Sequence, residues 1–72
     1  MGRNTFNDHL TDRELEILHL LAEGWNNKKI AVTLNLTVRT VKFHTGNIYN
    51  RLDVRSRSEA IVWAWKHNEI QV

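Results

Sequence analysis

Apolar residues recur three or four positions apart in four separate stretches of the chain, which is the spacing of amphipathic helices. None of these stretches shows the strict alternation that is typical of a half-buried strand. The first predicted helix follows Thr11 and ends at Gly24, and the second covers about 27–34. The third covers about 38–52, and the fourth follows Ser56 and ends near His67. The sequence therefore predicts an all-α, four-helix domain.

Residues that cap free backbone groups mark the ends of these helices. Thr11 with Glu14, and Ser56 with Glu59, have the spacing of capping boxes, in which each side chain accepts a hydrogen bond from the other residue's backbone N–H. Leu10 and Leu15 occupy the two positions of a hydrophobic staple at the first helix. The other expected caps are Asn26 and Thr37 at helix starts, and Gly24, Asn35, Asp53 and Asn68 at helix ends.

The second and third predicted helices are joined by a very short link, Asn35 to Thr37. A link this short makes the helices cross steeply, as in a helix-turn-helix. The positions that this motif restricts carry suitable residues: Ala31 where the helices approach, Asn35 at the left-handed turn, and Val41 as an apolar anchor. The pattern predicts a central helix-turn-helix, although a steep helical pair that binds nothing would satisfy the same spacing.

The third predicted helix has two unlike sides. One side suits a core and carries Val41, His44, Thr45, Ile48 and Leu52. The other side carries Arg39, Lys42, Phe43, Gly46, Asn47 and Asn50, and no acidic residue occurs from Val38 to Leu52. A helix fits the DNA major groove, where lysine or arginine can bind guanine and an apolar group can contact the thymine methyl. Gly46 costs about 1 kcal/mol of helix stability relative to alanine, and either close approach to DNA or tolerated variation explains it.

The formal net charge of +2 conceals an uneven distribution. Residues 1–23 hold two basic and five acidic residues, a net charge of −3. Residues 24–57 hold seven basic residues and one acidic residue, a net charge of +6. Residues 58–72 hold one basic residue and two acidic residues, a net charge of −1. The positive middle segment suits a polyanion, and a solvated basic face is the alternative interpretation of the charge alone.

Composition narrows the function classes further. With 72 residues, 42% of them hydrophobic, the chain is one small globular domain, and it has no cysteine for a disulfide. The longest apolar run is the six residues from Ala60 to Trp65, too short to span a membrane. The four histidines lack compact ligand spacing, and there is neither a nucleophile–base arrangement nor a glycine-rich phosphate loop. These patterns favour a cytoplasmic domain that is not an enzyme and holds no metal or cofactor.

Several segments resemble the LuxR-type (also NarL/FixJ-type) DNA-binding domain of bacterial transcription regulators. They include Leu10-Thr11-Asp12-Arg13-Glu14, Asn27-Lys28-Lys29-Ile30-Ala31, Thr40-Val41-Lys42-Phe43-His44 and Arg51-Leu52-Asp53-Val54-Arg55, in register over about residues 10–70. The resemblance implies sequence-specific binding of double-stranded DNA by the third helix. It also implies the output domain of a response regulator in a two-component system, or a small stand-alone regulator, associated with the nucleoid. Residues 1–9 are then an N-terminal tail or a linker remnant.

The resemblance assigns site residues by position. It implies DNA-base contacts at Arg39, Lys42, Phe43, Gly46 and Asn47. It implies phosphate contacts at Asn27, Lys28, Thr37, Thr40, Arg55 and Arg57. The chain departs from the family pattern at Lys29, which replaces an acidic residue, at Asn35 and Asp53, which replace glycines, and at Phe43, which is bulkier than the usual small aliphatic residue. The preferred base sequence therefore cannot be copied from relatives.

The fourth predicted helix has an apolar pair outside its core side. Ala60, Ile61 and Ala64 form the inward side, whereas Val62 and Trp65 point elsewhere. The family commonly dimerises through this helix, which implies a homodimer contact made by Val62, Trp65, Lys66 and Glu69. An indole that covers the edge of its own domain is the other interpretation. The alternative function is a protein-interaction module of the same fold that contacts RNA polymerase or a regulator.

Overall fold

A computed structural model describes residues 10–67 of the chain, and this part contains four helices and no strand. The helices are α1 (Asp12–Ala22), α2 (Asn27–Leu34), α3 (Val38–Leu52) and α4 (Arg57–Lys66). The predicted all-α class, and the predicted order and bounds of the first three helices, are confirmed.

Each helix begins with a side chain that accepts a hydrogen bond from the backbone N–H three residues later. Thr11 accepts from Glu14 at 3.1 Å, Asn26 from Lys29 at 2.8 Å, and Thr37 from Thr40 at 3.0 Å. Ser56 accepts from Glu59 at 3.2 Å in the same way. Such a cap stabilises a helix by about 1 kcal/mol, so polar residues at these places fix where the helices start.

The first three helices end with the same turn. A residue with a left-handed backbone follows each of these helices. Asn35 (φ 59°) and Asp53 (φ 57°) come directly after α2 and α3, and Gly24 (φ 90°) comes two residues after the end of α1. The next residue, Trp25, Leu36 or Val54, donates its N–H to a carbonyl five positions earlier, at 3.1, 2.8 and 2.9 Å. This is a Schellman motif, which reverses the chain direction while it satisfies the last carbonyls. The apolar residue after each turn then packs against the core.

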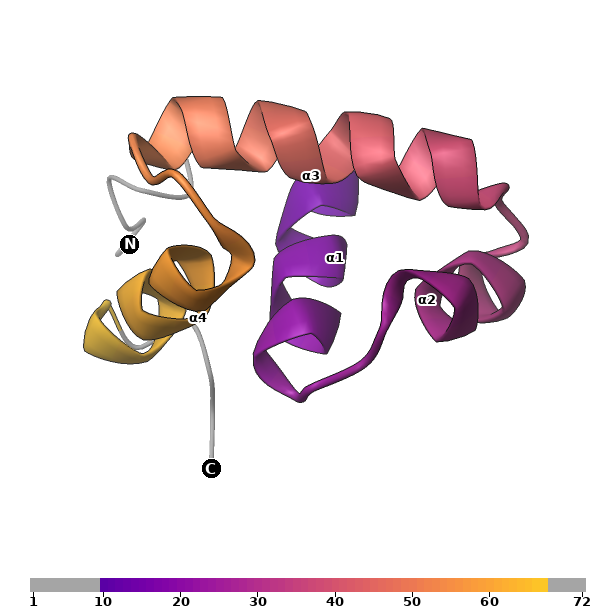
Figure 1. Cartoon of the computed structure of the whole chain (residues 1–72), viewed down its shortest axis with the longest axis horizontal. Helices are drawn as coiled ribbons and strands as arrows, with labels where there is room; N and C mark the ends of the chain where they lie inside the picture. Colours follow the sequence, from indigo (N-terminus) through magenta and orange to yellow (C-terminus); the bar gives the residue numbers. More distant parts are fainter. Residues whose placement is uncertain (1–9, 68–72) are drawn as a thin grey trace.

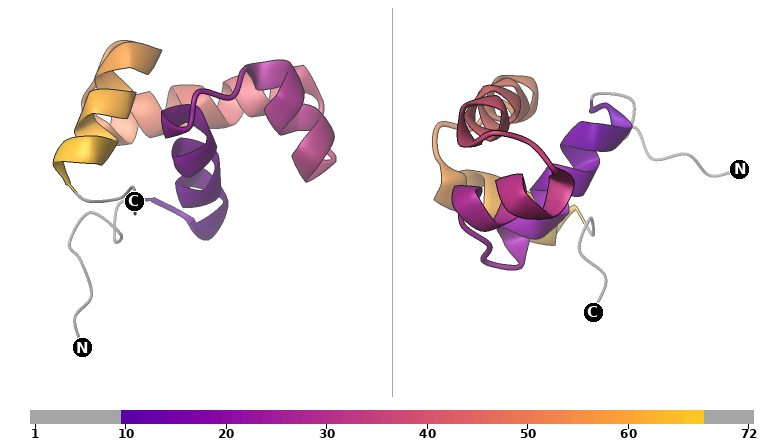
Figure 2. Two further views of the ribbon diagram at one scale, coloured as in Figure 1. Left: turned by 90° about the horizontal axis from the view of Figure 1, so that it is seen from below. Right: turned by 90° about the vertical axis from the view of Figure 1, so that its right-hand side faces the viewer.

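The core lies between α1 and the three other helices. Its fully buried side chains include Ile17, Leu18, Leu21, Ile30, Val41 and Ile48. Helix α1 packs against α3 and α4, and α3 packs against α2 and α4. In Figure 1, α3 runs across the top of the molecule, with α2 beneath its N-terminal end, α1 beneath its middle and α4 beneath its C-terminal end. The two other views agree that α1, α2 and α4 lie on one side of α3, which leaves its opposite side uncovered by the described chain (Figure 2).

Two details at α4 differ from the predictions. The Glu59 carboxylate accepts from the N–H of Arg55 at 2.8 Å, not from Ser56, so only half of the predicted second capping box forms. The two capping residues differ in backbone angle: Ser56 has φ −152°, whereas Thr11, whose capping box is complete, has φ −73°. Helix α4 ends at Lys66 with His67 as its cap, one residue earlier than predicted. Asn68, the predicted cap, and residues 1–9, the predicted tail, lie outside the described residues.

Candidate nucleic-acid interface

The uncovered side of α3 presents the cationic and aromatic residues that the sequence placed there. Arg39, Lys42 and Phe43 are all exposed, and 65% of the Phe43 surface is accessible to solvent. The opposite side of the helix buries Val41 and Ile48 completely. The core therefore fixes the rotation of α3 about its own axis, and with it the direction in which the exposed residues point.

Gly46 and Asn47 continue this side of α3 and are half-buried. No other side chain or distant backbone atom lies within 4 Å of the position that a Cβ at Gly46 would occupy. The space next to Gly46 is therefore open in the free domain, and packing inside the protein does not require a glycine.

The two threonines predicted to contact phosphate lie at the N-terminus of α3. Thr37 accepts from the backbone N–H of Thr40, and its hydroxyl donates to the Thr40 hydroxyl oxygen at 3.0 Å. Both bonds are exposed to solvent. Because the Thr37 hydroxyl proton is used in the bond to Thr40, the donors offered to a phosphate are the free N–H groups of this helix start and the Thr40 hydroxyl. The electrostatic potential at a helix start also suits a phosphate.

The start of α2 supplies a second group of cations. Lys28 is exposed, and Asn27 is half-buried beside it. The Lys29 ammonium lies over the indole ring of Trp25, 4.2 Å from the ring centroid, a cation–π contact. The cation that replaces the usual acidic residue is therefore held against Trp25.

The two arginines after α3 lie in different surroundings. Arg55 is exposed. Arg57 is half-buried, and its guanidinium donates to the Trp25 carbonyl oxygen, which ties the start of α4 to the α1–α2 connection. Arginine carries five N–H donors, so this contact leaves donors for a phosphate, but it gives Arg57 a structural role that the sequence did not reveal.

A partly buried ion pair anchors the far end of α3. Arg51 donates to Glu14 Oε1 at 3.1 Å, and the Glu14 side chain is only 4% exposed. The same oxygen accepts the Thr11 N–H at 3.0 Å, so the predicted capping box of α1 is also a contact with α3. No local signal in the sequence identified this pair, since its partners are 37 positions apart.

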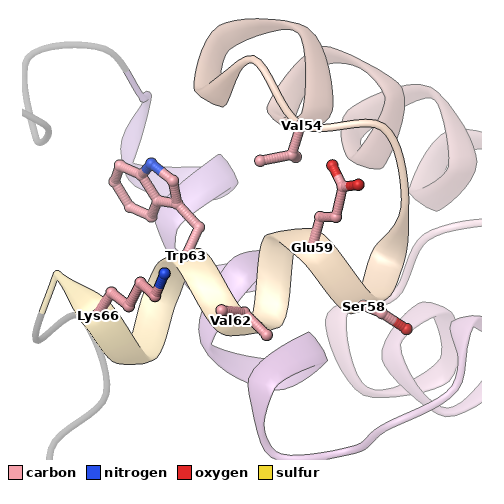
Figure 3. Close-up of a pocket in the computed structure, with 6 residues that line it drawn as sticks. All are labelled: Val54, Ser58, Glu59, Val62, Trp63 and Lys66. Atoms are coloured by element: carbon pink, nitrogen blue, oxygen red, sulfur yellow. The ribbon is translucent and has the colours of Figure 1, made fainter.

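Helix α4 carries a surface hollow lined by Val54, Ser58, Glu59, Val62, Trp63 and Lys66. Figure 3 shows Glu59 and Trp63 rising from α4 on the side of Val54, which projects from the α3–α4 connection. Trp63 packs against the core, and its indole stacks on the His67 ring at 3.9 Å between centroids. Val62 and Trp65, the predicted dimer pair, are 51% and 48% exposed, whereas Glu69 lies outside the described residues.

Within residues 10–67, no group of three or more histidine and carboxylate side chains is arranged to hold a metal ion. None of the four helices is long and apolar enough to cross a membrane.

Comparison of the sequence with known proteins identifies the family of this chain. The model of the family described as bacterial regulatory proteins, luxR family, matches residues 8–64. Response regulator proteins VraR of Staphylococcus aureus, Staphylococcus saprophyticus and Staphylococcus epidermidis are each 47% identical over 62 residues, which is 86% of this chain. The chain spans 30% of the length of these relatives. The chain therefore belongs to the luxR family of bacterial regulatory proteins, and its four helices form the helix-turn-helix DNA-binding domain of that family.

Proposed function

We propose that this domain binds double-stranded DNA sequence-specifically, with α3 in the major groove. The observation that carries the proposal is the outer side of α3, where Arg39, Lys42 and Phe43 are exposed while the opposite side of the helix is buried in the core. An α-helix is narrow enough to enter the groove, and these three residue types match the polar edge of guanine and the apolar methyl of thymine.

Base contacts and phosphate contacts are assigned to different parts of the surface. The proposed base-contacting residues are Arg39, Lys42, Phe43, Gly46 and Asn47. The proposed phosphate-contacting residues are Asn27, Lys28, Thr37, Thr40, Arg55 and Arg57. Phosphate contacts from the start of α2, the start of α3 and the segment after α3 would hold both ends of the reading helix and fix its register along the groove.

We also propose that two copies bind one DNA site through α4. Val62 and Trp65 leave about half of their apolar surfaces in solvent, on a helix whose other side is buried through Ala60 and Ala64. Groove-reading domains that pair in this way bind half-sites about one helical turn apart. Lys66 and Glu69 are the proposed polar members of the contact.

The relatives named response regulators favour a place for this domain in a two-component system. We propose that it is the output domain of such a regulator, acting at the nucleoid, where an upstream signal changes how readily two copies meet on DNA. A small stand-alone regulator would use the same surface without that control.

Selection of binding sites from random double-stranded DNA tests the main proposal. The expected result is one enriched motif that is roughly two-fold symmetric, because two α3 helices would read equivalent half-sites. Enrichment of no motif would overturn sequence-specific binding.

NMR titration separates this function from a protein-interaction module for RNA polymerase. If the domain binds DNA, adding DNA is expected to shift the signals of residues 39–47. Shifts confined to α4 when polymerase is added, with none in α3 when DNA is added, would favour the interaction module.

A further inference from the structure

Phe43 is a large apolar side chain that the free domain leaves in water. Phe43 is 65% exposed, and among the described residues its ring makes an edge-to-face contact with His44, at 5.7 Å between centroids and 63° between planes. Burying a phenylalanine is worth about 1.5–3 kcal/mol, and the fold does not use this gain. Two exposed cations, Arg39 and Lys42, lie on the same helix within about one turn of Phe43. A polyanion drawn to these cations would therefore come close to the ring.

Gly46 lies one turn further along the same side of α3. Like the exposed ring of Phe43, it is unfavourable in the free domain and has no reason in the fold. It sits inside a regular helix, where glycine destabilises by about 1 kcal/mol relative to alanine, and it has no left-handed backbone angle to justify it. Helical side chains lean toward the N-terminus, so a side chain at position 46 would cover the turn that contains Lys42 and Phe43. With glycine there, nothing in the domain lies within 4 Å of the place that a Cβ would occupy.

We propose that Phe43 and Gly46 form a notch for the 5-methyl group of a pyrimidine in the major groove. The inference rests on the proposed DNA binding and names the chemical group that this site reads. The methyl group is the one apolar feature on the major-groove edges of the bases, and it is the partner that an exposed phenyl ring would bury. Thymine and 5-methylcytosine carry this methyl at the same ring position, so the ligand class is a 5-methylpyrimidine.

Replacing single thymines with deoxyuridine in the selected DNA site tests the notch, because deoxyuridine removes the methyl and keeps the base pair. At one thymine per half-site, affinity is expected to fall about fourfold or more, as for one buried methyl group. Replacement at the other thymines is the internal control and should have little effect. A site that tolerates deoxyuridine at every thymine overturns the notch while DNA binding stands, whereas failure to select any site would refute the DNA-binding proposal itself.

Two variants assign the methyl to these residues. Phe43→Ala is expected to bind thymine and deoxyuridine sites equally, since the exposed ring contributes nothing to the core. Gly46→Ala is expected to unfold at the same or higher urea concentration, yet to lose most of the thymine preference. A Gly46→Ala variant that keeps the full thymine preference would overturn the role of the open space.

A second pair of duplexes separates the two sources of the methyl group. With cytosine or 5-methylcytosine at the same position, the 5-methylcytosine duplex is expected to bind several times more tightly. Equal binding of the two would confine the notch to thymine and overturn the wider ligand class.

Discussion

Glu14 shows how one side chain can serve local and tertiary structure together. Its Oε1 atom accepts from the Thr11 N–H at 3.0 Å and from Arg51 at 3.1 Å, and the side chain is buried. The exposed pair Arg13–Glu16, at 3.4 Å, lies on the same helix but is solvated on both sides. An exposed pair of this kind is worth less than about 1 kcal/mol, and it joins two residues of one helix. The Glu14–Arg51 contact instead joins α1 to α3 through a buried carboxylate, so it helps to orient α3.

Two lysines on the proposed interface are expected to behave differently when replaced by alanine. Lys42→Ala should weaken binding to the preferred site by about 1–3 kcal/mol and relax the preference at one base pair, since its ammonium is proposed to bind a base edge. Lys28→Ala should weaken all sequences alike and lower the slope of log affinity against log salt by about 0.9, since it is proposed to bind phosphate. Titrations on matched and mismatched duplexes at several salt concentrations measure both effects.

Each of these variants is the control for the other, because both remove one exposed lysine. Equal weakening of every sequence by Lys42→Ala would contradict its assignment to a base. A changed base preference in Lys28→Ala would contradict its assignment to phosphate.

At the scale of elements, the three Schellman turns set the directions of the helices. Gly24 adopts its left-handed angle without steric cost, whereas Asn35 and Asp53 adopt similar angles with side chains present. The turn after α2 leaves only Leu36 and Thr37 before α3, so the angle at Asn35 decides how α3 leaves the core. The helix-turn-helix geometry therefore depends on one backbone conformation.

Asn35→Ala is expected to destabilise the domain by about 1 kcal/mol, because alanine lacks the local hydrogen bonding that makes the left-handed region accessible to asparagine. Asn35→Gly should be neutral or slightly stabilising, since glycine adopts the angle freely. Urea denaturation measures both free energies of unfolding.

Asn50→Ala is the matched control for this prediction. It makes the same chemical change at an exposed position inside α3, where alanine has the higher helix propensity, so it should be neutral or stabilising. If both alanine variants shift stability in the same direction, the left-handed angle at Asn35 is not the cause.

At the scale of the molecule, the basic start of α2 and the exposed apolar pair of α4 lie at different ends of the domain. The segment from 24 to 57, with seven basic residues and one acidic residue, contains α2, α3 and the connection to α4, whereas the exposed pair Val62 and Trp65 lies on α4. Figure 1 places α2 and α4 beneath opposite ends of α3. A second copy could therefore meet α4 without covering the start of α2 or the start of α3.

Val62→Ser is expected to reduce affinity for DNA with two half-sites by about tenfold or more, because it removes an apolar contact from each copy, and to leave binding to a single half-site unchanged. Val32→Ser is the matched control, since Val32 is 75% exposed on α2, away from α4. Sedimentation of the protein–DNA complexes and titrations on one-site and two-site duplexes provide the measurements. Equal losses on both kinds of duplex would refute pairing through α4.

Most of the fold followed from signals that act over a few residues. The caps at Thr11, Asn26 and Thr37, the left-handed residues and the apolar spacing correctly predicted where α1, α2 and α3 begin and end. The exposed side of α3 was predicted in the same way, because burial of Val41 and Ile48 fixes what faces outward. The second capping box was predicted incorrectly, since a carboxylate next to two free N–H groups binds whichever one the backbone brings closer.

The sequence by itself determined the helices, their ends and the character of each side, because these depend on hydrogen bonds and periodicity within one or two turns of chain. Only the tertiary structure decided the contacts between helices. It paired Glu14 with Arg51, tied Arg57 to the Trp25 carbonyl, and packed Trp63 against the core while Trp65 stayed half exposed. These contacts depend on how the helices cross, and the crossing is set jointly by all the side chains that fill the core. No local stretch of the sequence carries that information.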